Sequence, residues 1–164
     1  MAALKPGTTA PAIQLPLLGG GTFSLADLLS HGHVALAFFK VSCPVCQYSF
    51  PFFDRMATLL KGKGLSFIGV SQNDAEQTAE FAKQFGVNFP IALDDPRRYP
   101  VSNAYGLTTV PTLFVVDEEG SISHSIVSWS KRDMESLYAE FRDSQNADLK
   151  LFPSSESVAE FKVG

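Results

Sequence analysis

The sequence predicts an α/β domain with a central mixed sheet, helices on both faces of that sheet, and an added N-terminal hairpin. Strand-sized apolar runs alternate with helical patterns between residues 33 and 105. Such alternation is typical of parallel strands joined by crossover helices. A turn sequence at 117–120 separates the two last strands, which predicts that these two are antiparallel. Apolar residues make up 45% of the chain, enough to fill one core.

Each expected element rests on the period of its apolar residues and on the turn or capping residues at its ends. Ser24 and Ser130 are expected to cap helices, with Asp27 and Asp133 completing capping boxes three residues later. Pro51 lies inside a helical pattern and is expected to kink it. In chain order we expect a hairpin over 4–23, a short helix to 29, a strand over 33–41, a helix over 45–60, a strand over 65–71, a helix over 74–85, a strand over 90–93, a helix over 99–105, strands over 112–116 and 121–128, and a helix over 130–141.

The chain has 164 residues, the length of a single domain. We expect residues 1–142 to form that domain and residues 143–164 to be a C-terminal tail. The tail sequence is polar, with a few scattered apolar residues. It is therefore expected either to dock on the domain or to be partly disordered.

Charge and hydropathy argue against several classes of partner. Lys and Arg number 13 and Asp and Glu number 17, a formal net charge of −4, and no basic block occurs. This balance disfavours nucleic acid and anionic membranes as partners. No apolar run reaches the roughly 18 residues of a membrane helix, and Pro6 and Pro11 interrupt any secretory signal. We expect a cytoplasmic protein, a monomer or weak dimer; a chain trimmed of its signal, and so periplasmic, would look similar.

The two cysteines of the chain lie in one tetrapeptide, Cys43-Pro44-Val45-Cys46. Cys43 falls where the expected strand 33–41 ends and the next helix begins. A helix N-terminus stabilises a thiolate, the form of cysteine that acts as a nucleophile. Residues one helical turn apart also bring their sulfurs within reach of a disulfide. We predict a redox dithiol, in which Cys43 attacks from nearer the surface and Cys46 resolves the mixed disulfide.

The sequence disfavours two other interpretations of the cysteines. A structural zinc site needs two more ligands, usually cysteines or a close histidine pair. The histidines are His31, His33 and His124, and the first two lie at the far end of the strand, roughly 25–30 Å from Cys43. The cysteines could also be inert and buried. We expect neither a metal site nor a cofactor.

Several motifs together resemble a known fold and family. The Cys-x-x-Cys at a strand-to-helix junction, Pro51 after it, and Thr-Val-Pro-Thr at 109–112 resemble the thioredoxin fold. Segments 5–11 and 104–120 are similar to redoxins of the alkyl hydroperoxide reductase and thiol-specific antioxidant type. The resemblance implies that Pro111 is a cis-proline facing the cysteines and that the backbone of Val110 pairs with a substrate strand. It also implies a protein or small thiol partner, as disulfide substrate or as reductant.

The same residues help to choose a branch of this family. Peroxiredoxin active sites resemble Pro-x-x-x-Thr-x-x-Cys, but the threonine position holds Lys40 or Cys43, depending on which cysteine is peroxidatic. The sequence therefore favours a thiol-disulfide oxidoreductase acting in cell redox homeostasis. A peroxiredoxin-like thiol peroxidase with antioxidant activity and a non-catalytic redox-sensing module are the alternatives. Ala37 and Ser49 stand where relatives carry acids, so we expect no carboxylate base for Cys46. Lys40 is either a group that lowers the pKa of Cys43 or a solvated residue.

Overall fold

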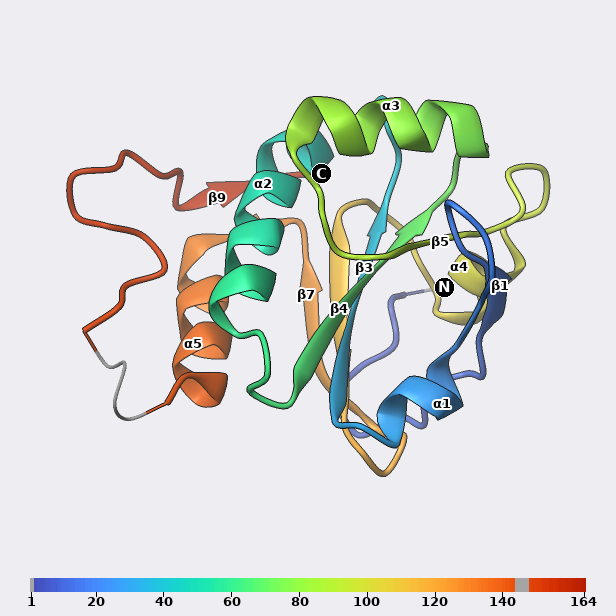
Figure 1. Cartoon of the computed structure of the whole chain (residues 1–164), viewed down its shortest axis with the longest axis horizontal. Coiled ribbons are helices and arrows are strands. Elements are labelled where there is room, and N and C mark those ends of the chain that lie inside the picture. Colours follow the sequence, from blue (N-terminus) through green and yellow to red (C-terminus); the bar gives the residue numbers. More distant parts are fainter. Residues whose placement is uncertain (1, 144–147) are drawn as a thin grey trace.

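The computed structural model describes residues 2–143 and 148–164 (Figure 1). Its main sheet is mixed and has five strands in the order β5-β4-β3-β6-β7. The central strand β3 is parallel to β4 and antiparallel to β6, while β4–β5 is parallel and β6–β7 antiparallel. The strands are β3 (His33–Phe39), β4 (Leu65–Ser71), β5 (Ile91–Leu93), β6 (Thr112–Val116) and β7 (Ile122–Val127). The predicted mixed sheet is confirmed.

Helices and a small hairpin cover this sheet on both faces, as expected. Figure 1 shows α2 and α5 on one side of the sheet, and α1, α4 and the hairpin on the other. The hairpin is β1 (Gln14–Pro16) with β2 (Thr22–Ser24), paired antiparallel. The helices are α1 (Leu25–Leu29), α2 (Pro44–Leu59), α3 (Ala75–Phe85), α4 (Pro100–Ala104) and α5 (Lys131–Phe141).

The central strand β3 divides the core into two clusters, because its side chains alternate between the two faces. Ala35, Ala37 and Phe39 join the cluster that α2, α3 and α5 complete. Val34 and Phe38 join the cluster made with the hairpin, α1 and the region of α4. Residues 34–39 are all fully buried, which explains why their sequence is apolar at every position.

The helix starts follow the expected local chemistry. Ser24 accepts a hydrogen bond from the Asp27 N–H at 3.4 Å, and Ser130 accepts one from the Asp133 N–H at 3.2 Å. The helix α2 runs from Pro44 to Leu59 with Pro51 inside it, so the proline does not end the helix.

The expected strand over 121–128 is β7, which ends at Val127 because Ser128 has a left-handed backbone with φ of 68°. A short further strand, β8 (Trp129–Ser130), follows it and was not predicted. Strand β8 pairs antiparallel with β9 (Phe161–Lys162), a strand that the sequence did not predict. Residues 148–164 thus pack against the domain, while 144–147 lie outside the described residues. The boundary at 142 stays a prediction. In the described part of the chain, no helix is long and apolar enough to cross a membrane.

Candidate active site

The cysteine pair lies at the carboxyl end of the central strand β3. Cys43 is the N-cap residue of α2, with an extended backbone, and Pro44 takes the first helical position, where the missing N–H costs no hydrogen bond. The turn before it is braced from two sides: Asn73 accepts a hydrogen bond from the Val41 N–H, and the Gln47 side chain donates one to the Val41 carbonyl. The dithiol is therefore held on a short, fixed turn between the central strand and a 16-residue helix.

The two sulfurs have different surroundings. Cys43 is half-buried, and its Sγ accepts a hydrogen bond from the Cys46 N–H at 3.3 Å, the usual contact of a capping side chain. Cys46 is fully buried one turn further on. Burial raises the pKa of the Cys46 thiol well above its usual range, and the neighbouring Cys43 raises it further, against a backbone hydrogen bond at Lys40 that lowers it. Cys46 is thus a protonated thiol at neutral pH.

A second loop meets the cysteines from the start of β6. Because β6 is antiparallel to β3, its first residue, Thr112, pairs with Phe38 near the end of β3. The Val110–Pro111 peptide bond in this loop is cis, as the resemblance implied. The Cys43 thiol donates a hydrogen bond to the Val110 carbonyl at 3.4 Å, so the backbone before the proline directly faces the outer sulfur.

A cavity of about 380 Å³ opens beside Cys43. Lys40, Cys43 and Val110 line it, whereas Cys46 and Pro111 are buried next to it. All five predicted site residues therefore lie together. The Lys40 ammonium sits 5.6 Å from the centroid of the Tyr99 ring. An action of Lys40 on the pKa of Cys43 stays a prediction.

No Asp or Glu side chain is among the described residues that line this cavity. Ala37 is fully buried in β3, in the same cluster as Cys46. The Ser49 hydroxyl donates a hydrogen bond to the Val45 carbonyl of its own helix, at 2.6 Å, so it is already used. Ala37 and Ser49 therefore supply no base to the buried thiol.

Tyr99 and Gly164 are among the cavity-lining residues that the sequence did not predict as part of the site. Tyr99 has a left-handed backbone with φ of 50° just before Pro100, and its ring faces Lys40. Gly164, at the far end of the numbering, lines the same cavity as Cys43. No short sequence pattern predicts that either residue lines the cavity, because the path of the chain between secondary-structure elements places them there.

Comparison with known proteins identifies several relatives that are named as thiol-disulfide oxidoreductases. The chain is 32% identical over 135 residues to the thiol-disulfide oxidoreductase ResA of Geobacillus kaustophilus, covering 81% of this chain and 76% of that protein. It is 31% identical over 121 residues to ResA of Bacillus subtilis, covering 73% and 66%.

Solved structures share the fold. A thiol:disulfide interchange protein of the thioredoxin family from Chlorobium tepidum matches with a TM-score of 0.69 and 25% identity, over 85% of this chain and 99% of that one. The thioredoxin domain of a thiol-disulfide oxidoreductase from Bacteroides vulgatus matches with a TM-score of 0.76, at 24% identity, over 86% and 100%. The fold is therefore thioredoxin-like. The Redoxin family model matches residues 5–140, and the chain accordingly belongs to the redoxin family.

Proposed function

We propose that this protein is a thiol-disulfide oxidoreductase, with Cys43 as the attacking nucleophile and Cys46 as the resolving thiol. One observation carries the assignment of roles. The sulfur of Cys43 is half-buried at a helix N-terminus and opens on a cavity, whereas Cys46 is fully buried with a raised pKa. Only the outer sulfur can meet a partner, and only the inner one is shielded from competing reactions.

In the reducing direction, the Cys43 thiolate attacks one sulfur of a partner disulfide. A bond forms between Cys43 and that sulfur, the partner's disulfide breaks, and its second sulfur leaves as a thiolate. The Cys46 thiol then loses its proton and attacks Cys43. The new bond is the Cys43–Cys46 disulfide, and the first partner sulfur leaves as a thiolate that takes up a proton. Two electrons pass to the partner, and an external thiol reductant restores the dithiol.

The partner class that fits this site is a protein disulfide or dithiol. The names of the relatives point to the same reaction class. The carbonyl of Val110 lies 3.4 Å from the attacking sulfur, so a polypeptide beside this loop would present its disulfide to Cys43. A role in cell redox homeostasis, a cytoplasmic location and a monomeric or weakly dimeric state belong to the proposal; cell fractionation and sedimentation test the last two.

Insulin reduction with dithiothreitol as electron donor tests the reaction. The wild-type protein should accelerate precipitation of the insulin B chain, and Cys43→Ser should abolish the acceleration. Ser42→Ala, an exposed neighbour on the same turn, is the matched control and should keep full activity. Full activity in Cys43→Ser would overturn the proposal.

Stopped-flow mixing with hydrogen peroxide tests the alternative of a thiol peroxidase. Lys40 stands where the peroxide-binding threonine would be, so we expect Cys43 to react no faster than a free cysteine thiolate. A faster reaction by several orders of magnitude would favour the peroxidase. The reduction potential then gives the direction: a value near roughly −270 mV fits a reductant, and one near roughly −120 mV fits an oxidant.

A further inference from the structure

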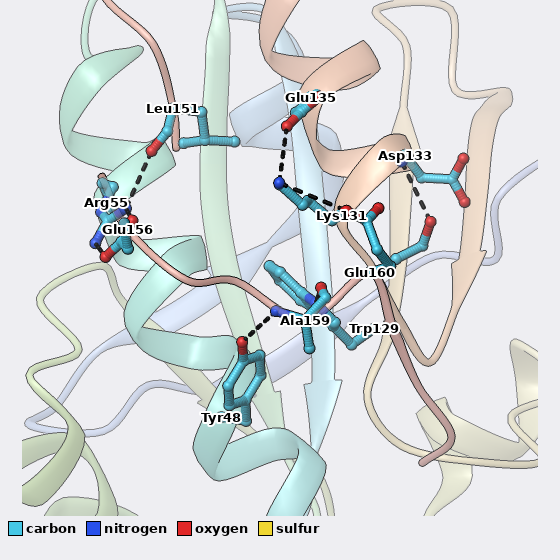
Figure 2. A network of polar contacts seen from close by, with 11 residues as sticks. Tyr48, Arg55, Trp129, Lys131, Asp133, Glu135, Leu151, Glu156, Ala159 and Glu160 are labelled. Carbon is cyan, nitrogen blue, oxygen red and sulfur yellow. Dashed lines mark hydrogen bonds and ion pairs between the residues drawn. The ribbon is translucent and has the colours of Figure 1, made fainter. Parts of the chain in front are cut away.

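Residues 148–159 are bound to the face of the domain that carries α2 and α5 (Figure 2). The Arg55 guanidinium on α2 holds Glu156 through two parallel hydrogen bonds of 2.6 and 2.8 Å. Further on, the backbone of Ala159 is fixed twice: its N–H donates to the Tyr48 hydroxyl at 2.9 Å, and its carbonyl accepts from the Trp129 indole at 2.7 Å. Leu151 and Phe152 are buried in the core cluster. This part of the tail is a structural component of the domain.

Residues 160–164 continue from this anchor toward the cysteines. Strand β9 pairs with β8, and the Lys131 N–H donates to the Glu160 carbonyl at 2.9 Å. Gly164 then reaches the loop before Pro111. Its N–H donates to the Ser128 hydroxyl at 3.0 Å. A side chain on Gly164 would overlap the Val110 carbonyl and come within 3.2 Å of the Pro111 ring. Residue 164 thus lies directly against the backbone that faces Cys43.

Two segments therefore compete for one place. A substrate polypeptide that pairs with the Val110 backbone has to lie where Gly164 now lies, since backbones in contact cannot share that volume. We propose that residues 160–164 are an autoinhibitory segment, which occupies the docking strand of a protein substrate and has to swing away before that substrate reaches Cys43. This inference rests on the proposed function, because it gives the covered backbone the role of a docking site.

The contacts of residues 160–164 are those of a segment that can detach from the domain. Strand β9 has only two residues, and the side chains of Phe161 within it and Val163 after it are exposed, by 59% and 73%. Nothing from this segment enters the buried core, in contrast to Leu151 and Phe152. The hydroxyl that holds Gly164 comes from Ser128, which has a left-handed backbone. Displacement after Ala159 would break the β8–β9 pairing but leave the buried core and the hydrogen bond from the Trp129 indole to the Ala159 carbonyl intact.

The segment should hinder large substrates and spare small ones. The aromatic disulfide dithiodipyridine needs only the Cys43 sulfur, whereas insulin has to dock a polypeptide on the Val110 backbone. If the segment covers the site about 90% of the time, the rate with insulin is lowered about tenfold, since only the uncovered fraction is competent. The reactivity toward dithiodipyridine should stay unchanged.

Two variants and one control test this. A chain lacking residues 161–164 should reduce insulin about tenfold faster than the full chain. Ser128→Ala, which removes the hydroxyl acceptor and leaves the backbone in place, should give a smaller increase of about threefold. Val163→Ser alters an exposed side chain of the same segment and should match the wild type. Reaction of Cys43 with dithiodipyridine should be equal in all four proteins.

The possible outcomes distinguish a failure of the autoinhibitory segment from a failure of the proposed oxidoreductase function. Equal insulin rates in wild type, truncation and Ser128→Ala, with dithiodipyridine reacting normally, would overturn the autoinhibitory segment and leave the dithiol chemistry standing. Failure of the wild type to react with dithiodipyridine would overturn the proposed function itself. As a second readout, hydrogen exchange at 161–164 should become fast when Cys46→Ser is trapped in a mixed disulfide with an insulin chain. Unchanged protection in that complex would contradict the inference.

Discussion

The resolving step should depend steeply on pH. Cys46 is fully buried, and burial raises the pKa of its thiol above the usual range. No described Asp or Glu side chain lines the adjoining cavity to take up its proton. The reactive thiolate is therefore a small fraction that grows about tenfold with each pH unit for as long as the pH stays below the pKa. Between pH 7 and 9, the rate of resolution should rise about a hundredfold.

Stopped-flow release of thiopyridone from dithiodipyridine measures this directly. The first phase reports attack by Cys43, and the second reports its displacement by Cys46. The second phase should show a slope of about one logarithmic unit per pH unit across this range. Cys46→Ser is the control, because it should release one equivalent and show no second phase. A second phase that is independent of pH between 7 and 9 would refute the account of the buried, unassisted thiol.

Three further predictions concern stability. Burial raises the pKa of both Cys46 and Tyr105 above their usual values of 9.0 and 10.0, so both groups ionise in the unfolded chain first and stability is lost as the pH rises past those values. Urea unfolding should show each group costing about 1.4 kcal/mol per pH unit there, and Tyr105→Phe should remove its share; a flat profile up to pH 11 would contradict this. Trp129→Phe loses a fully buried indole and its hydrogen bond to the Ala159 carbonyl, and should lower the free energy of unfolding by about 2 kcal/mol. An unchanged unfolding midpoint in urea would contradict this prediction. Asp94 accepts hydrogen bonds from the backbone N–H groups of Asp95, Val101 and Ser102 and from the Ser102 hydroxyl, so Asp94→Ala should cost about 3 kcal/mol by the same assay. An equal cost for Asp95→Ala, at the half-buried neighbouring position, would show that the full burial of Asp94 is irrelevant.

The parts of this fold that could be predicted are those whose causes are local. Strand β3 is buried on both faces, and the unbroken apolar run at 34–39 records that burial. Ser24 and Ser130 cap helices through hydrogen bonds that span three residues, so their signal is visible in a short window of sequence. The cysteine pair is also a local motif, because one helical turn joins its two sulfurs.

The parts that could not be predicted depend on contacts between distant residues. Strand β9 has two residues and pairs with a strand about 30 positions earlier, so no periodicity marks it. The apolar anchors of the tail, Leu151 and Phe152, were visible in sequence, but not the surface that they cover. The position of Gly164 beside Val110 follows from the whole path of the tail across α2 and β8, which no short pattern encodes.

The most direct test of the central claim is a comparison of the two single-cysteine proteins. Cys46→Ser keeps the outer sulfur, and Cys43→Ser keeps the fully buried one. At neutral pH, Cys46→Ser should react with dithiodipyridine more than about a hundredfold faster than Cys43→Ser, since each unit of raised pKa lowers the thiolate fraction tenfold. Equal rates in the two variants would contradict the assignment of Cys43 as the nucleophile and Cys46 as the resolving thiol.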